Sequence, residues 1–397
     1  MQPRPRIAVA LGLVLLAVAA LGGSAAARQQ PLPKPKAKTT AGRVEALAMD
    51  GARIAFDVAA GYGSKTRCNA VYVWNVARNT TTRASGRETC GADTTSTGAG
   101  VRELALAGGR AAWIVNKGGN SESDDYLYAS AVTRPRERIV ASARRSGSVD
   151  GVLTGNWLGG LVGSGSFLAV DHWSTDASGA VATVQLQRVG TRLGGIAEGP
   201  ETMLAQSTDG RQIAVLRTDS TIGLYSTRGT LLRSVTSRQR AIEVALRRDY
   251  LVALTGGSLE VYNSHSGRLL RTWRVAPGTR SLDVSSGLAA YASGGSVQVV
   301  RLSTGKRVLG VRAGAPVSAV QLEPAGLAYA SGRGDRPARI VFVPMKRVLP
   351  KTAYAGKAGI ASLVGAAESA PKTAYAGKAG IASLVGAAES APKQPRR

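Results

Sequence analysis

The clearest fold signal in the chain is the stretch Leu259-Glu260-Val261-Tyr262-Asn263-Ser264-His265-Ser266-Gly267, which the apolar pair Leu269-Leu270 follows. The same pattern occurs before it, over Ile222–Gly229, and after it, over Val297–Gly305. The glycines that end these three stretches are spaced by 38 residues. Short apolar runs bounded by Gly, Asn and Ser are typical of β-strands joined by tight turns. The stretch therefore belongs to a repeated unit of roughly forty residues that contains about four short strands.

A repeat of this length and strand content predicts an all-β propeller in which each four-stranded unit is one blade. The spacing fits seven blades over residues 43–348, and six or eight stay open because the third unit is irregular. An open solenoid and a pair of β-sandwiches are the alternative arrangements. A closed ring is favoured because it removes exposed strand edges. The seven units are expected to begin near Arg43, Val101, Val149, Thr202, Ala241, Arg280 and Val317.

Two features of the repeat resemble the WD-repeat family and its looser bacterial propeller relatives. Ser207-Thr208-Asp209-Gly210-Arg211-Gln212-Ile213-Ala214-Val215 is similar to the Asp-Gly turn between the first two strands of a WD blade, and Tyr225 and Tyr262 stand where that family usually has Trp. The resemblance covers about 300 residues. It implies the propeller fold. The Trp-Asp dipeptide and the Gly-His pair of standard WD blades are absent, so the resemblance implies no particular partner.

The N-terminal residues predict export. Arg4 and Arg6 precede an apolar run over residues 7–23, and Ser24-Ala25-Ala26-Ala27 supplies small residues of the kind that signal peptidase accepts. We therefore expect residues 1–27 to be a signal peptide and the protein to be secreted or associated with the cell envelope. An uncleaved membrane anchor is the alternative, although the run is short for a spanning helix.

Two segments of biased composition flank the predicted propeller. Residues 28–42 are rich in Pro and Lys and are expected to form an extended, solvated linker. Residues 349–397 form an Ala/Gly-rich tail, in which residues 351–371 recur without change as residues 372–392. The glycines in each copy weaken a helix, so the tail is expected to be a disordered or weakly helical extension.

The chain is strongly basic, with a net charge of +26. Its Lys and Arg residues are scattered rather than clustered, which argues against nucleic acid as the partner. An unknown protein or an anionic envelope polymer fits better, and contact with a membrane is expected only through an uncleaved signal anchor. The hydrophobic fraction of 44% is enough for a sizeable folded core.

The chain has only two cysteines, Cys68 and Cys90. In an exported protein a disulfide between them is the default expectation. A hairpin that turns near Asn79 would bring the two sulfurs opposite each other, and closing such a loop would stabilise the fold by about 3 kcal/mol. A zinc site is disfavoured because no histidine lies nearby to complete the ligand set.

Candidate recognition residues come from the longer connections between the second and third strands of the units. We expect these in the first, second, third and seventh units, over residues 59–69, 116–125, 173–179 and 331–338. The seventh unit closes on the first, so the four connections would form one arc on one face of the ring. The residues with binding potential are Tyr62, Lys65, Arg67, Asp124, Asp125, Tyr126, His172, Trp173, Arg333 and Asp335.

Signals for catalysis are weak. The chain has two histidines, His172 and His265, and no nucleophile elbow or metal-binding pair accompanies either one. We expect no cofactor and no metal, and we favour a non-enzymatic binding or scaffold propeller. One alternative is a carbohydrate-active or other hydrolytic enzyme that works in the propeller funnel and needs acidic residues there. Another is a structural component of the cell envelope anchored by the tail.

Overall fold

The computed structural model describes residues 34–59, 69–86, 100–118, 122–147, 153–178, 180–199, 203–334 and 336–345. In these ranges every regular element is a β-strand, as the repeat predicts. All strand pairs are antiparallel, and they make up six sheets, of which five have four strands and one has eight. The described part of the chain is therefore an all-β structure built mainly from four-stranded sheets.

Three of the four-stranded sheets follow one another in the second half of the chain, with their strands in chain order. The clear sequence repeats lie in these sheets. Their strands are β14 (Met203–Thr208), β15 (Gln212–Arg217), β16 (Thr221–Ser226) and β17 (Leu231–Thr236); β18 (Ala241–Arg247), β19 (Tyr250–Thr255), β20 (Ser258–Asn263) and β21 (Leu269–Arg274); and β22 (Thr279–Ser285), β23 (Leu288–Ser293), β24 (Ser296–Arg301) and β25 (Arg307–Arg312).

The first half of the chain contains one more four-stranded sheet and the eight-stranded one. The four-stranded sheet has β2 (Leu47–Asp50), β3 (Arg53–Val58), β4 (Ala70–Asn75) and β5 (Thr80–Arg83). The eight-stranded sheet has β6 (Gly100–Ala107), β7 (Arg110–Gly118), β8 (Glu122–Ala131), β9 (Arg138–Gly147), β10 (Leu153–Ser164), β11 (Phe167–Thr175), β12 (Val181–Val189) and β13 (Leu193–Gly199).

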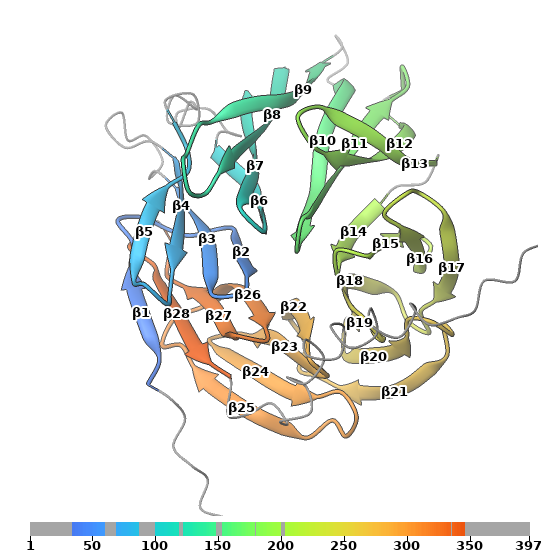
Figure 1. Cartoon of the computed structure of the whole chain (residues 1–397). Helices are drawn as coiled ribbons and strands as arrows, with labels where there is room; N and C mark the ends of the chain where they lie inside the picture. The colour runs from blue at the N-terminus through green and yellow to red at the C-terminus, as the bar shows by residue number, and fades with distance from the viewer. Residues whose placement is uncertain are drawn as a thin grey trace, which may run out of the picture. The chain divides into compact units, whose positions relative to one another are not determined.

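The inner strands of these sheets contact one another in a cycle. β2 contacts β6, and the contacts continue through β10, β14, β18 and β22 to β26 (Val317–Glu323), which contacts β2 again. Figure 1 shows these strands around the middle of the ring, with the later strands of each sheet toward its outside. This closed cycle of antiparallel sheets is a β-propeller.

The last sheet closes the ring with a strand from the other end of the described chain. β26, β27 (Gly326–Ser331) and β28 (Arg339–Pro344) are completed by β1 (Lys36–Thr39), whose Lys38 lies opposite Ile340 (Figure 1). The prediction of a linker over residues 28–42 is therefore wrong for residues 36–39. The Lys-rich composition suggested a solvated segment, but the backbone of these residues pairs with the free edge of β28.

The core lies between neighbouring sheets. Second strands supply small residues such as Ala214, Ala253 and Ala328, which are fully buried and let the sheets approach closely. Fourth strands are mostly exposed, and β17 and β21 carry arginines along the outer edge. Charged edge strands of this kind resist pairing with other chains.

The inner strands begin within four residues of the predicted unit starts. No helix long and apolar enough to cross a membrane occurs in the part of the chain that the structure describes. The predicted signal peptide and tail lie outside the described residues, as do Cys68 and Cys90 with their predicted disulfide.

Candidate functional site

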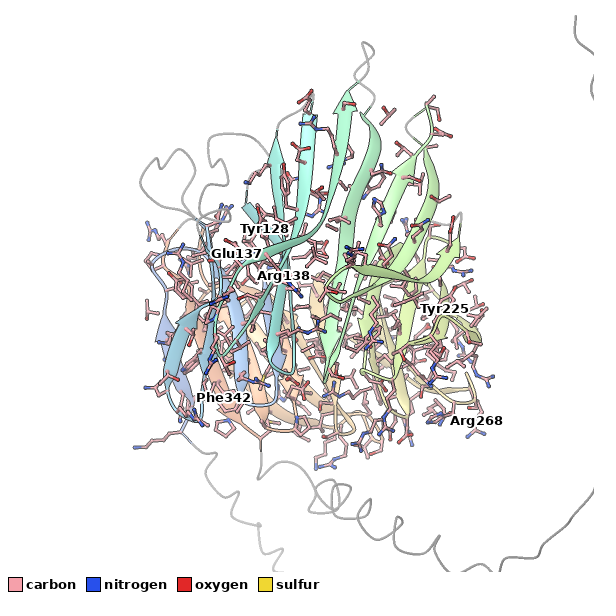
Figure 2. The ribbon with its side chains drawn as sticks, turned by 45° about the horizontal axis from the view of Figure 1, so that its top comes forward. Tyr128, Glu137, Arg138, Tyr225, Arg268 and Phe342 are labelled. Carbon is pink, nitrogen blue, oxygen red and sulfur yellow. The ribbon has the colours of Figure 1, made fainter. Side chains whose placement is uncertain are left out.

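The eight-stranded sheet is taller than the rest of the ring. Its strands β7 to β12 have 9 to 12 residues, whereas most strands from β14 to β28 have six. Each extra residue adds about 3.3 Å of strand, so the additional height is on the order of 10–20 Å. Figure 2 shows these strands rising above one face of the ring. We call the segment from Gly100 to Gly199 the tall sheet.

The tall sheet is continuous because β9 pairs with β10. Gly147 lies opposite Leu153, and Arg145 lies opposite Gly155. Gly155 has a φ of +121°, and a Cβ atom there would lie 2.4 Å from the carbonyl oxygen of Arg144. Only glycine fits this position, and its N–H donates a 2.8 Å hydrogen bond to the hydroxyl of Thr175. This seam joins an outer strand to the inner strand that follows it.

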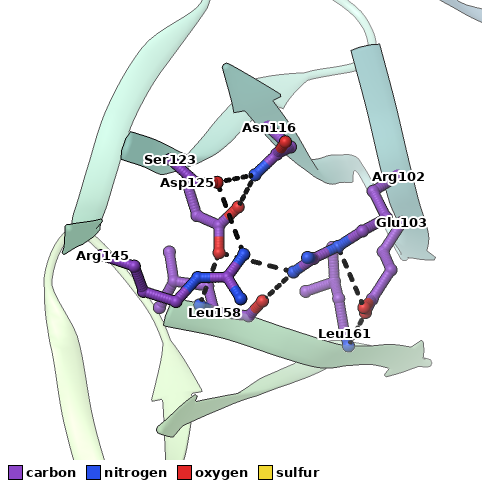
Figure 3. Close-up of polar contacts among 8 residues, drawn as sticks. All are labelled: Arg102, Glu103, Asn116, Ser123, Asp125, Arg145, Leu158 and Leu161. Atoms are coloured by element: carbon purple, nitrogen blue, oxygen red, sulfur yellow. Dashed lines mark hydrogen bonds and ion pairs between the residues drawn. The ribbon is translucent and has the colours of Figure 1, made fainter. Parts of the chain in front are cut away.

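A polar network around Asp125 connects strands of the tall sheet (Figure 3). The carboxylate of Asp125, which is 1% exposed, accepts hydrogen bonds from the amide of Asn116 at 2.6 Å and from the backbone N–H of Leu158 at 3.0 Å. The guanidinium of Arg102 lies 3.5 Å from the same carboxylate and also donates to the carbonyl of Leu158. Asp125 therefore fixes β8 to β10, and it is not available as the binding residue that the sequence predicted.

Asp124 and Tyr126 point to the other side of β8, as strand alternation requires. Asp124 forms an ion pair with Arg144 at 2.8 Å, and both side chains are accessible. Tyr126 packs beside Tyr128, with 6.3 Å between the ring centroids, and Lys117 Nζ lies 5.1 Å from the centre of the Tyr126 ring. An aromatic ring with its cation is therefore presented on this side of the tall sheet.

A second aromatic group lies on β10 and β11. Trp157 and Trp173 stack with 5.3 Å between their ring centroids, and the guanidinium of Arg145 lies 5.3 Å from the centre of the Trp157 ring. Both tryptophans are half-buried. Trp173 packs against the apolar cluster that includes Phe167 and Val184. Trp173 is thus part of a half-buried aromatic pair, and its role in recognition stays a prediction.

His172 points to the opposite side of β11 from Trp173. It lies opposite Leu158, the residue whose backbone N–H donates to Asp125. Burial lowers the pKa of His172 below its usual value. Its buried Nε2 makes no hydrogen bond in the described part of the chain. The lowered pKa favours the neutral form of the side chain at pH 7.

Two predicted long connections are strands. The segments 116–125 and 173–179 were predicted as loops, but β7 and β8 extend to Gly118 and from Glu122, and β11 extends to Thr175. The polar residues in these segments suggested loops. They occupy strand positions because the strands continue beyond the apolar core, where both sides of a sheet can be polar.

The remaining predicted residues divide into two groups. Arg333 lies in the connection from β27 to β28 and is exposed, as expected. Tyr62, Lys65, Arg67 and Asp335 lie outside the described residues. The structure therefore places the candidates on β8 and β11 in one sheet but packs Tyr126 and Trp173 against different apolar clusters, and it places Arg333 in a different sheet.

The sequence reasoning missed a set of carboxyl groups in the centre of the ring. The inner strands line a cavity of about 380 Å³ that includes Glu103, Glu243, Asp283 and Glu323. Burial raises the pKa of Glu103, and it raises the pKa of Glu243 and Glu323 to about 7 and that of Asp283 to about 6. The sequence signal was present, because Glu243, Asp283 and Glu323 are spaced by 40 residues.

These carboxyl groups link neighbouring inner strands. Glu103 accepts from the N–H of Leu161 at 2.6 Å, Glu243 accepts from Leu282 at 2.8 Å, and Asp283 accepts from Leu322 at 2.6 Å. Leu161 and Leu282 lie at register shifts of β10 and β22, and Leu322 lies on β26, an edge strand of its sheet, so these backbone N–H groups have no ladder partner. The carboxyl groups of the preceding inner strands satisfy these N–H donors, which is a structural role.

Arg247 spans the cavity at the end of β18. Its guanidinium donates to Glu323 at 2.6 Å and to the hydroxyl of Ser164 at 2.9 Å. The arginine thus connects three inner strands, β10, β18 and β26. No group of three or more His, Cys, Asp or Glu side chains that could hold a metal ion occurs among the described residues.

Comparisons with known proteins show no family for this chain. No protein-family model and no curated protein matches the chain. One similar solved structure is Raptor from Chaetomium thermophilum, which is 11% identical over 79% of this chain and 29% of that chain, with a TM-score of 0.49. Another is BamB from Moraxella catarrhalis, which is 9% identical over 77% of this chain and 84% of that chain, with a TM-score of 0.45. A third is the Mitotic Checkpoint Complex, which is 14% identical over 78% of this chain and 94% of that chain, with a TM-score of 0.49.

These neighbours are WD40 and other β-propeller proteins. The chain spans less than a third of the Raptor chain. Each TM-score is below 0.5, so the assignment of the fold rests on the sheet order and on the cycle of inner strands instead.

Proposed function

We propose that the protein is an exported, non-enzymatic binding or scaffold propeller that recognises a protein partner through the tall sheet. The observation that carries this proposal is the extra height of β7 to β12, which carry half-buried aromatic and cationic side chains in an otherwise regular ring. Aromatic and Arg side chains supply most of the energy at protein interfaces. Rigid strands also lose less entropy on binding than flexible loops do.

The propeller is proposed to have seven blades. The eight-stranded sheet counts as two blades joined at the seam of β9 and β10, and the sheet completed by β1 counts as one. Seven inner strands in one cycle of contacts support this count.

Export, the disulfide and the tail belong to the same proposal. The apolar run over residues 7–23 supports a signal peptide and a secreted or envelope location. An oxidising compartment supports the Cys68–Cys90 disulfide. The duplicated tail is proposed to hold the protein at the cell envelope, and deletion of residues 351–397 should release it from isolated envelopes. Full retention of the truncated protein would contradict that role.

The carboxyl groups of the central cavity favour binding over hydrolysis. A glycosidase needs two carboxyl groups free to act on one bond. Glu103, Glu243 and Asp283 each accept backbone N–H donors, and Glu323 is paired with Arg247. Their hydrogen-bonding capacity is used within the ring.

Site-specific photo-crosslinking tests the recognition surface. A photoreactive amino acid at position 117 or 144, both on the tall sheet, should trap a protein partner in the producing cells, identified by mass spectrometry. The matched control is position 271, an exposed arginine on β21 of a regular sheet. The same trapped protein from all three positions, or none from positions 117 and 144, would contradict recognition by the tall sheet.

A further inference from the structure

One part of the ring has basic residues without acidic ones. Residues 284–322, which comprise most of the sheet of β22–β25 and the start of the next sheet, contain no Asp or Glu. The same stretch contains Arg301, Lys306, Arg307 and Arg312. In a chain with 25 acidic residues such a stretch is locally unbalanced, so its surface carries a positive potential.

Two adjoining hollows lie on this surface. The first has a volume of about 470 Å³ and is lined by Ser296, Gln298, Arg307 and Arg312. The second has a volume of about 530 Å³, and its polar lining residues Ser296, Arg312 and Arg333 stand beside Gly294, Gly295, Gly314, Ala315 and Pro316. Ser296 and Arg312 lie opposite each other on β24 and β25 and belong to both hollows. The two hollows therefore adjoin at this pair of residues, and together we call them the depression.

The depression lies where two sheets of the ring meet. Arg307 and Arg312 come from β25, whereas Arg333 comes from the connection between β27 and β28 in the neighbouring sheet (Figure 1). The turn between β23 and β24 is short and contains Gly294 and Gly295, which line the second hollow. A short turn beside a longer connection leaves the surface recessed at this point.

A glycine keeps the first hollow open. Gly310 lies opposite Gln298 on β25. A Cβ atom at Gly310 would lie 3.3 Å from Oε1 of Gln298 and 3.7 Å from Nη1 of Arg307. Any side chain here would enter the space that these two polar groups face.

The three arginines have no carboxylate partner in the part of the chain that the structure describes, whereas Arg144 and Arg247 each form an ion pair. Arg307, Arg312 and Arg333 are all exposed. A guanidinium offers a planar fork of N–H donors that fits an oxyanion. A carboxylate occupies one fork, but a phosphate group has enough oxygens and charge to take forks from two arginines.

We propose that this depression is a binding site for an anion that carries two neighbouring phosphate groups. Arg307 and Arg312 bind one phosphate in the first hollow, and Arg312 and Arg333 bind the other in the second. Ser296 and the amide of Gln298 add neutral donors. The site is separate from the tall sheet, so this proposal does not depend on the proposed partner surface.

Calorimetric titration of the full chain tests the site, with inorganic pyrophosphate, orthophosphate and succinate as probes. Pyrophosphate should bind about tenfold tighter than orthophosphate, because only pyrophosphate fills both hollows with charge-assisted hydrogen bonds. Succinate has two carboxylates and should bind more weakly than pyrophosphate. Equal affinity for pyrophosphate and orthophosphate, equal affinity for succinate, or no binding of pyrophosphate at millimolar concentration would overturn the proposal.

Variants separate the site from general charge attraction. Arg312→Gln should weaken pyrophosphate binding about tenfold, and Arg307→Gln and Arg333→Gln about threefold to fivefold each. The matched control is Arg274→Gln, since Arg274 ends β21 as Arg312 ends β25 and is likewise exposed. An equal loss in Arg274→Gln would show that only net charge matters and would overturn the site.

A variant that keeps every charge provides a second test. Gly310→Val should fill the first hollow and weaken pyrophosphate binding by at least threefold, while the melting temperature stays close to that of the parent. Unchanged binding with an intact fold would overturn the assignment of the first hollow.

Titration with long-chain polyphosphate identifies the source of the phosphate pair. Tighter binding of polyphosphate than of pyrophosphate assigns the ligand to a polymer, and equal binding assigns it to a soluble diphosphate.

Discussion

The sheets from Met203 to Arg312 and the tall sheet from Gly100 to Gly199 share one strand order but differ in regularity. The regular sheets have mostly six-residue strands, minimal turns and glycines at a constant spacing. The tall sheet has longer strands, a seam between β9 and β10, and the polar network around Asp125. Closure of the ring needs only sheets of the regular kind, with six-residue strands. Departures from this kind of sheet cost conformational entropy and polar burial, which is expected where a surface has a further use.

The largest expected effect tests whether the core of the tall sheet is tightly packed, as in the regular sheets. Trp113 on β7 is fully buried and stacks on Tyr128 with 6.0 Å between ring centroids. Trp113→Ala should lower the free energy of unfolding by about 3–5 kcal/mol, measured by urea denaturation. The control is Trp273→Ala on β21, where the half-buried ring should cost about 1–2 kcal/mol. Equal losses would mean that the core of the tall sheet is loosely packed.

A smaller effect distinguishes Asp125, which is buried in the polar network, from Asp124 on the other side of β8. Asp125→Ala leaves the N–H of Leu158 and the side chains of Asn116 and Arg102 without their acceptor, and should cost about 2–4 kcal/mol in urea denaturation. Asp124→Ala removes only the exposed pair with Arg144 and should cost less than about 1 kcal/mol. A reversed order would remove the structural role assigned to Asp125.

The smallest effect concerns pH and the carboxyl groups of the regular sheets. Burial raises the pKa of Glu243 to about 7 in the folded state, above its ordinary value of 4.5. Between these pH values the folded chain holds a proton that the unfolded chain has lost, so stability falls as the pH rises from about 4.5 to 7. Below that window the full contribution is present. The melting temperature should therefore be higher at pH 5 than at pH 7.5.

Glu243→Gln removes this titration. Its melting temperature should change less between pH 5 and 7.5, by an amount that corresponds to on the order of 1–3 kcal/mol in the unfolding free energy. The matched change Glu198→Gln, at an exposed position of the tall sheet, should leave the pH dependence as it is in the parent. A parent whose stability rises over this pH range would contradict the assignment.

The sequence predicts the regular half of the fold well, for a physical reason. Each unit buries its own apolar strands against the next, so the pattern around Tyr225 recurs around Tyr262 and sets the strand positions locally. The same locality explains why the inner strands could be placed within a few residues.

The tall sheet and the ring closure could not be predicted in the same way. Ser123, Asp124 and Asp125 alternate as strand residues, but strands that leave the apolar core have no hydrophobic pattern to reveal them. β1 is short and lysine-rich, and only the unpaired edge of β28, about 300 residues away, makes it a strand. Of the candidate site, Tyr126 and Trp173 stay predictions, whereas the inner carboxyl groups were missed because their partners are backbone N–H groups of another unit.

The pairing of β1 with β28 also sets the order in which the chain can mature. Lys36–Thr39 leaves the ribosome near the beginning of synthesis, and its partner Arg339–Pro344 leaves only after every other described strand. The intermediate sheets can pack on their neighbours as they appear, but the circle stays open until both ends meet, and contacts of such long sequence separation form slowly. A product that terminates before β28 would leave β1 without its partner strand. Closure of the ring thus requires the last described strand to be present.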